Sequence, residues 1–235
     1  MTVIKNDLFD EASDIALQSH TSDSGGGWQG TESSLNVLGA TDDVESTVTS
    51  VVTVIGDEAP SETDYFVEAT GTFGILGAND RWGILLRAGG GASHQANGIG
   101  SSYYFFRLIG NAGWSLWRVD AGSPITELGV NATYVADETI GAGDLVKLKA
   151  TISGTGATVS FTLEIDPDTL GYQTVGTPTD THANRIVAAN NVGIYTRQTN
   201  IRIKDFNAED LLSGVTAHQM QTYQGMDRMS GGFRK

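Results

Sequence analysis

Between residues 146 and 165 the chain alternates apolar and polar residues, breaks once, and then alternates again. In the run 146–152, Val, Leu, Ala and Ile fall on one side and Lys and Thr on the other, and the run 158–165 repeats this division. The break at 153–156 has the sequence Ser-Gly-Thr-Gly. Period-two alternation is typical of a strand with one buried and one solvated face, and a short glycine-containing break favours a hairpin. We therefore expect two antiparallel strands here.

Shorter runs of the same kind recur along the chain, at 3–9, 35–38, 47–55, 65–73, 81–88, 102–109, 113–119, 191–196 and 200–206. The 30 glycines lie mostly between these runs, and there are only 4 prolines. A helical 3.6-residue period is almost absent, with a hint of one only in the last residues. About a dozen short strands with turn residues between them indicate an all-β protein, an antiparallel two-sheet β-sandwich.

The N-terminal region carries a spaced set of residues, namely Asp7, Phe9, Leu17, His20, Asp23, Gly25, Gly26 and Trp28. This set resembles the entry motif of many phage and bacterial domains of the concanavalin A-like lectin/glucanase superfamily, in its laminin-G-like form. One extra glycine stands before the tryptophan here. Within that superfamily, His20 is expected to hydrogen-bond a loop backbone.

Four further segments resemble strands of the same superfamily: RWGILLRA, SYYFFRLI with GWSLWRV, the hairpin at 143–166 and the closing stretch 192–211. The resemblance covers roughly residues 5–212 and implies a jelly-roll body, 1–214, followed by an extended C-terminal arm, 215–235. Because this fold carries lectins, hydrolases and structural modules, the resemblance implies the fold more than the function. The entry motif is most similar to that of phage virion proteins.

The charge balance excludes several classes of function. With 28 acidic and 14 basic residues the net charge is −14, so the body is expected to repel nucleic acid. There are no cysteines, which excludes disulfides and cysteine-bound metals. No run of about 20 apolar residues predicts a membrane span. The first residues lack the features of a signal peptide, so we expect synthesis in the cytoplasm of the host.

The last 21 residues differ from the body. They hold three of the four methionines and a net charge of +2, which leaves −16 for the remainder. Methionine adapts to irregular surfaces, so we predict that this arm docks on a neighbouring subunit. The residues predicted to make the assembly contacts are Met220, Tyr223, Met226, Arg228, Met229, Phe233 and Arg234.

Aromatic residues cluster in the strands of the central region. Trp82, Tyr103, Trp114 and Trp117 are candidates for carbohydrate binding, because exposed aromatic rings stack on sugars. The alternative is that these side chains pack in the core, and this alternative is favoured.

The carboxylates suggest a catalytic site only at one place. The stretch Glu164–Asp168 resembles the Glu-x-Asp-x-Glu strand of the glucanases, in which alternation puts the carboxylates on one face. Here the third position is the shorter Asp168, and Pro167 interrupts the strand. We therefore predict that the protein is not an enzyme. Acidic pairs such as Asp42-Asp43 are interpreted as solvated turns, and no metal or cofactor is expected.

Three functional hypotheses follow. The first is a virion structural protein, a phage capsid decoration or accessory head or tail protein. It would reside in the virion, assemble through its arm, and have other virion proteins and its own copies as partners, in a homo-oligomer. The second is a carbohydrate-binding module with a glycan as partner. The third is a glycoside hydrolase.

Overall fold

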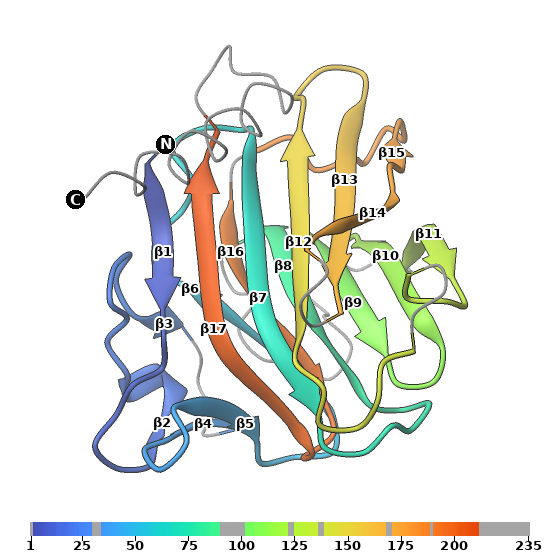
Figure 1. Cartoon of the computed structure of the whole chain (residues 1–235). Helices are drawn as coiled ribbons and strands as arrows, with labels where there is room; N and C mark the ends of the chain where they lie inside the picture. Colours follow the sequence, from blue (N-terminus) through green and yellow to red (C-terminus); the bar gives the residue numbers. More distant parts are fainter. Residues whose placement is uncertain are drawn as a thin grey trace, which may run out of the picture.

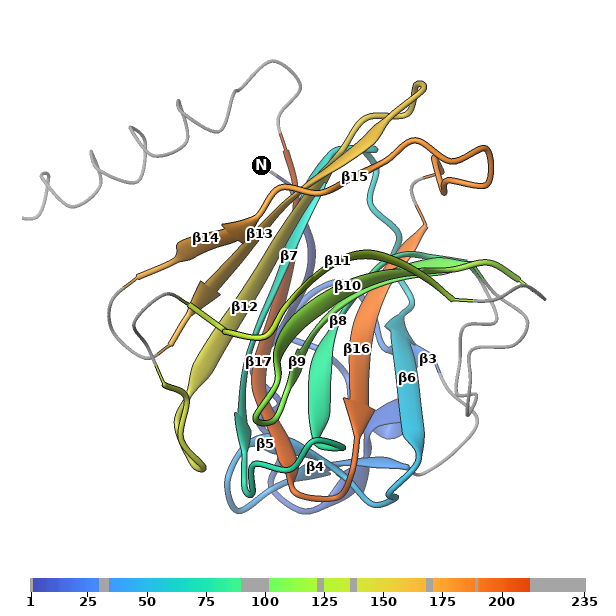
Figure 2. The same cartoon turned by 90° about the vertical axis from the view of Figure 1, so that its right-hand side faces the viewer.

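The computed structural model describes residues 2–29, 34–89, 102–121, 125–135, 139–167, 171–188 and 190–211. These residues form two antiparallel sheets that pack face to face (Figures 1 and 2). The predicted two-sheet jelly-roll sandwich is therefore confirmed. The predicted arm, with Met220, Tyr223, Met226, Arg228, Met229, Phe233 and Arg234, and the boundary at 214 lie outside the described residues.

The first sheet has ten strands. Its main path is β14 (Gln173–Gly176), β13 (Val159–Asp166), β12 (Val146–Ser153), β7 (Tyr65–Phe73), β17 (Ile201–Asp210), β5 (Asp43–Ser46), β4 (Leu35–Leu38) and β2 (Ile15–Ala16). Two more strands lie off this path: β1 (Val3–Asp7) pairs with β17, and β15 (Thr179–Asp180) pairs with β13. One short 3-10 turn, η1 (Leu17–Ser19), follows β2.

The second sheet has seven strands, in the order β11 (Thr126–Asn131), β10 (Gly113–Val119), β9 (Tyr103–Ile109), β8 (Arg81–Ala88), β16 (Asn191–Arg197), β6 (Val51–Gly56) and β3 (Trp28–Gln29). Figure 2 shows the two sheets as layers, with β7, β12 and β17 in one and β8, β16 and β6 in the other. The main core lies between them and includes Trp82, Phe106, Phe161, Ile194 and Phe206.

The predicted hairpin is present as β12 and β13, with Ile152 opposite Phe161 and Ser153 opposite Ser160. The alternation sorts its residues as expected, because the apolar positions of both strands are buried and the polar ones are not, apart from Asp166 at the end of β13.

Two predicted strands have different bounds. The run 3–9 ends as a strand at Asp7, because Phe9 has φ 55° and leaves the extended region. The run 47–55 becomes a strand only at Val51, since the Thr47 amide donates to the carbonyl of Ser34 instead of joining the ladder.

Both ends of the described chain lie at one end of the ten-stranded sheet (Figure 1). The Asp210 amide donates to the Thr2 carbonyl at 2.9 Å, and the Leu211 amide donates to the carbonyl of Asp64 at 2.9 Å. The segment that follows residue 211 therefore starts beside the N-terminal strand.

Candidate functional site

The outer face of the ten-stranded sheet carries a groove of about 460 Å³, which is within the range of about 300–1,000 Å³ typical of small-molecule sites. It runs across β1, β17, β7 and β12 and reaches the residue before β14. Its lining residues are Asn6, Leu8, Phe66, Glu68, Thr70, Lys147, Lys149, Tyr172, Asp205, Phe206, Asn207 and Glu209. They are mainly polar, because alternate residues of each strand point away from the core.

Strand pairing places four polar residues in one row across this face. Asn207 is opposite Glu68, Glu68 is opposite Lys149, and Lys149 is opposite Glu164. Adjacent strands are roughly 4.8 Å apart, so side chains in such a row can touch their neighbours. The row brings together residues that are up to 139 positions apart in the sequence.

Glu68 is the centre of the hydrogen bonding in the groove. Its Oε2 accepts a bond of 2.9 Å from the Tyr172 hydroxyl, and its Oε1 accepts one of 3.1 Å from Asn207 Nδ2. Lys149 Nζ lies 3.9 Å from Oε2. The carboxylate is therefore held in one orientation from three sides.

The side-chain amide of Asn207 forms hydrogen bonds through its nitrogen but not through its oxygen. Its Nδ2 donates to Glu68 and also to Glu209 Oε1 at 3.1 Å, so the amide nitrogen faces two carboxylates and the amide oxygen faces away. That oxygen is buried and has no hydrogen-bond partner among the described residues. A buried acceptor without a partner is costly, so the two bonds to carboxylates must hold this side chain in place against that cost.

Aromatic rings line the groove beside these polar groups. The Lys149 ammonium lies 4.2 Å from the Phe66 ring centre and 5.3 Å from that of Tyr172. Phe66 is buried, whereas Tyr172 is only partly buried and can contact a ligand. Burial and the charge of Glu68 raise the pKa of Tyr172, so its hydroxyl stays protonated and donates.

The described part of the stretch Glu164–Asp168, which resembles the glucanase strand, lies at the margin of this face. Glu164 and Asp166 both point outward from β13, as the alternation predicts, and the strand ends at Asp166, directly before Pro167. Burial raises the pKa of Glu164, Lys149 opposes this shift, and Glu68 adds to it. Asp168 lies outside the described residues.

The four aromatic residues proposed for carbohydrate binding do not share one site. Trp82 is 0% exposed and Trp114 is 4% exposed, and both pack in the core between the sheets, where a sugar cannot reach them. The hypothesis that Trp82 and Trp114 bind carbohydrate is therefore corrected, because both belong to the core. Tyr103 and Trp117 lie instead on the outer face of the seven-stranded sheet.

That outer face carries a second apolar cluster, in which Tyr103 and Phe105 are buried and Trp117 is partly buried. Phe105 stacks on Tyr195 with ring centres 5.1 Å apart and planes at 11°. Arg107 lies over these rings.

The residues of the entry motif form a buried clasp. His20 Nε2 lies 2.7 Å from Asp7 Oδ1, and its Nδ1 lies 2.7 Å from Glu11 Oε1. Asp7 also accepts a bond of 2.6 Å from the Trp28 indole. His20 therefore contacts two carboxylates and not the loop backbone that we expected, and the clasp is structural because its polar groups bond one another.

The same motif secures a buried lysine. Lys5 Nζ donates to Ser22 Oγ at 2.6 Å and to the carbonyl of Gly27 at 2.9 Å, and it lies 4.4 Å from the Trp28 ring centre. The ammonium therefore fastens the glycine-rich loop onto β1.

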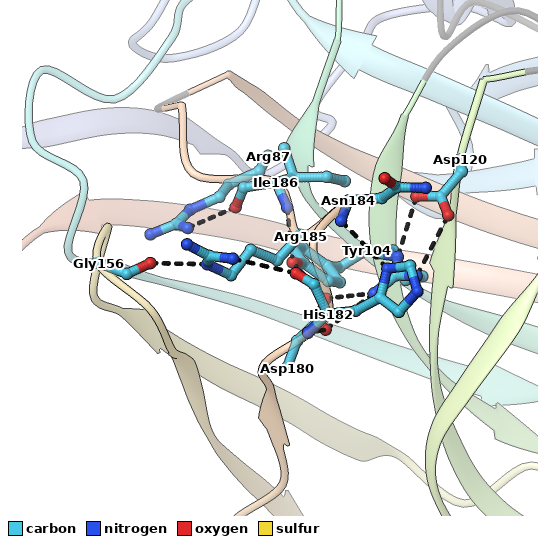
Figure 3. Close-up of polar contacts among 10 residues, drawn as sticks. Arg87, Tyr104, Asp120, Gly156, Asp180, His182, Asn184, Arg185 and Ile186 are labelled. Carbon is cyan, nitrogen blue, oxygen red and sulfur yellow. Dashed lines mark hydrogen bonds and ion pairs between the residues drawn. The ribbon is translucent and has the colours of Figure 1, made fainter.

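A second buried network holds the connection between β15 and β16 (Figure 3). The Tyr104 hydroxyl donates to Asp180 at 2.9 Å and accepts from the Ile186 amide at 2.9 Å. Arg118 Nη1 lies 2.8 Å from both Asp180 oxygens. Arg87 donates to the Ile186 carbonyl at 2.6 Å. These groups bond inside the protein, so they stabilise the loop and do not face a ligand.

Sequence reasoning did not identify the groove residues Glu68, Tyr172 and Asn207. Glu68 and Asn207 are polar residues at outward positions of two long strands, and that was the available signal. Among the residues that the structure describes, no group of three acidic or histidine side chains could hold a metal ion. Within the same residues, no helix is long and apolar enough to cross a membrane.

No protein-family model matches the sequence, and no curated protein matches it. Solved structures share the fold. The carbohydrate-binding module CBM66 from Bacillus subtilis is 10% identical with a TM-score of 0.52, over 71% of this chain and 86% of that one. A seed lectin of Lotus tetragonolobus is 10% identical with a TM-score of 0.52, over 89% and 99%.

The GH43 protein BlXynB from Bacillus licheniformis, in a K247S mutant form, is 16% identical with a TM-score of 0.55. This match covers 88% of the present chain but only 39% of that protein. At such identities the likeness shows the fold alone. The chain has the fold of the concanavalin A-like lectins and glucanases, as the resemblance of its sequence implied.

Proposed function

We propose that the protein is a carbohydrate-binding module and that the saccharide lies in the groove on the ten-stranded sheet. The observation that supports this most is the fixed array around Glu68, which Asn207, Lys149 and the Tyr172 hydroxyl hold beside the partly exposed ring of Tyr172. Sugars combine hydroxyl groups with apolar ring faces, so they match a surface that offers both polar groups and an aromatic ring.

Each polar group has a distinct part in this proposal. Asn207 orients Glu68 through its amide nitrogen, Glu68 accepts a bond from a sugar hydroxyl, and the Lys149 ammonium donates to a sugar oxygen. Tyr172 supplies the apolar surface while its hydroxyl keeps Glu68 in place. The groups are preorganised by their bonds to one another, which reduces the entropy lost on binding.

The charge of the groove favours a neutral saccharide. Its lining contains two lysines and three carboxylates, those of Glu68, Asp205 and Glu209, so the balance is −1. Glu164 and Asp166 lie close by and add to the negative charge. An acidic sugar would be repelled by this surface.

The test is a screen of neutral glycans followed by calorimetric titration of the best ligand. Tyr172→Ala and Asn207→Ala are expected to weaken binding by about tenfold each, from a lost stacking contact or hydrogen bond. Thr174→Ala, an exposed position on β14 outside the groove lining, is the matched control and should bind as the wild type does. If no neutral glycan binds, or if the two groove variants bind normally, the proposal is wrong.

We further propose that the groove binds without hydrolysing. Glu68 and Glu164 are two strands apart in their row, a backbone spacing of roughly 10 Å, whereas the carboxyl groups of a retaining pair are about 5–5.5 Å apart and those of an inverting pair about 6.5–9.5 Å apart. Lys149 also stands between them. Incubation with the bound glycan should release no reducing sugar. Release that disappears in a Glu164→Gln variant would overturn this proposal.

The second candidate is the virion structural protein. The observation that favours it is the placement of Thr2 beside Asp210, so the N-terminal residue and the segment 215–235 connect to the same end of the body. An attachment through this end would use both. Deleting 215–235 should lower incorporation into particles and change the mass of the protein in solution, and if neither changes, this segment is not the attachment.

A further inference from the structure

Three arginines lie together on the outer face of the seven-stranded sheet. Arg81 of β8 is opposite Arg197 of β16, and Arg107 of β9 is opposite Gly83, two residues further along β8. All three are partly exposed. In a chain with 14 basic residues and a net charge of −14, this concentration of positive charge is unusual.

The guanidinium group of Arg107 lies close to three aromatic rings. Its guanidinium carbon lies 5.0 Å from the Phe105 ring centre, 5.7 Å from that of Trp117 and 5.6 Å from that of Tyr195. Its Nε donates to Ser115 Oγ at 3.0 Å and its Nη1 donates to the Tyr195 hydroxyl at 3.0 Å. The group is therefore oriented before any ligand arrives, and Nη2 has no bond to any described residue.

The three arginines have no carboxylate partner in the part of the chain that the structure describes. Of the other described arginines, Arg118 pairs with Asp180 and Asp120 and Arg202 lies near Asp43 and Glu45, whereas Arg87 and Arg185 donate to backbone carbonyls. Arg81 Nε is in addition buried without a hydrogen-bond acceptor. Guanidinium groups that have no carboxylate partner and keep unbonded N–H donors favour binding of an anion.

Arg81 and Arg197 also destabilise the charge of Arg107. Burial lowers the pKa of Arg107, and the neighbouring charges of Arg81 and Arg197 lower it further. An anion placed among them would relieve this repulsion.

We propose that this face binds a short acidic saccharide, whose carboxylates meet Arg81, Arg107 and Arg197 and whose ring lies against the partly exposed Trp117. A carboxylate matches the two parallel donors of a guanidinium, and an indole ring suits the apolar face of a sugar. The ligand is short because the acidic body repels a long polyanion more than a small one. The arginine site is on a different sheet from the groove, so the proposal for this site does not depend on the proposed function of the groove.

The test is titration with a disaccharide of galacturonic acid and, separately, with the corresponding neutral disaccharide of galactose. The acidic disaccharide is expected to bind at least about tenfold more tightly than the neutral one. Its affinity is expected to fall when the salt concentration rises from about 50 to about 200 mM. Arg197→Gln and Arg81→Gln should each weaken it by about tenfold, because each removes charge-assisted bonds. Arg197→Lys, which keeps the charge but not the fork, should fall in between.

Arg202→Gln is the matched control, since it removes one positive charge from the other sheet and should leave the affinity unchanged. In the wild type, the indole NH resonance of Trp117 should shift on titration, which tests the location without any variant. Equal affinity for the two disaccharides would overturn the proposal, as would normal binding by the Arg81 and Arg197 variants. Inorganic sulfate that binds as tightly as the acidic disaccharide would show a general anion site and overturn the saccharide assignment.

Discussion

Replacing His20 with glutamine is expected to remove a pH-dependent part of the protein's stability. His20 is 3% exposed, and its two ring nitrogens lie 2.7 Å from carboxylate oxygens of Asp7 and Glu11. Only the imidazolium can donate to both. Burial by itself would lower the pKa of His20, but the hydrogen bonds and charges of Glu11 and Asp7 outweigh it, so the pKa lies above its ordinary value of 6.5.

The direction of the pH dependence follows from that raised pKa. Below pH 6.5 His20 is protonated in the folded and the unfolded chain, and its bonds stabilise fully; as the pH rises from there through the folded pKa, this stabilisation is lost. Each charge-assisted bond contributes about 1.5–3 kcal/mol. Glutamine can keep one of the two, so His20→Gln should lose about 2–3 kcal/mol near pH 6, or roughly 4–12 °C in Tm.

The measurement is urea unfolding of wild type and variant at pH 6 and at pH 8.5. The difference in unfolding free energy between the two proteins should shrink at the higher pH by about 1–2 kcal/mol, because neutral histidine also keeps only one bond. His182→Gln is the control, since His182 is exposed. The unfolding free energy of this variant should stay within about 0.5 kcal/mol of the wild-type value at both pH values. If the difference in unfolding free energy between wild type and His20→Gln is the same at both pH values, His20 is not a protonated bridge between Asp7 and Glu11.

Four further substitutions test the packing by urea unfolding. Gly25→Ala should destabilise the fold by more than about 2 kcal/mol, because φ is +82° and the new Cβ would lie 2.0 Å from a carbonyl oxygen. Gly143→Ala should cost only about 1–2 kcal/mol, because φ is +87° there but nothing lies within 4 Å of the new Cβ. Arg118→Met should cost about 3–5 kcal/mol by leaving Asp180 buried without its partner, and adding Asp180→Asn should recover part of this loss. Trp82→Ala should cost about 3–5 kcal/mol through the cavity it leaves, without changing the affinity for any glycan.

The sequence predicted what depends on local pattern. Alternation located β12 and β13 and the faces of their residues, because a period of two needs no knowledge of the partner strand. Within β9 it also separates Tyr104 from Tyr103, which point to opposite faces of the sheet. It could not say which orientation is the core, because β9 is apolar on both faces, with Tyr104 on one and Tyr103 on the other.

The groove could not be predicted, because it depends on the order of the strands and not on any one strand. Glu68, Tyr172 and Asn207 meet only because β7 lies between β12 and β17 and because the chain before β14 returns over that sheet. Many sheet orders satisfy the same alternation. Nothing in the local pattern of the sequence distinguishes Glu68 from another outward carboxylate.

The placement of the two surfaces connects the competing functions. Glu209 lines the groove and precedes Asp210, whose amide donates to the Thr2 carbonyl at the end of the sheet where residues 2 and 211 lie, so an attachment through that end would crowd the groove. The arginine face belongs to the other sheet and would remain open. Binding of a neutral glycan that disappears on assembly, together with retained binding of the acidic disaccharide, is therefore the combination that would reconcile a virion role with saccharide recognition. Retention of both would mean that attachment does not use this end.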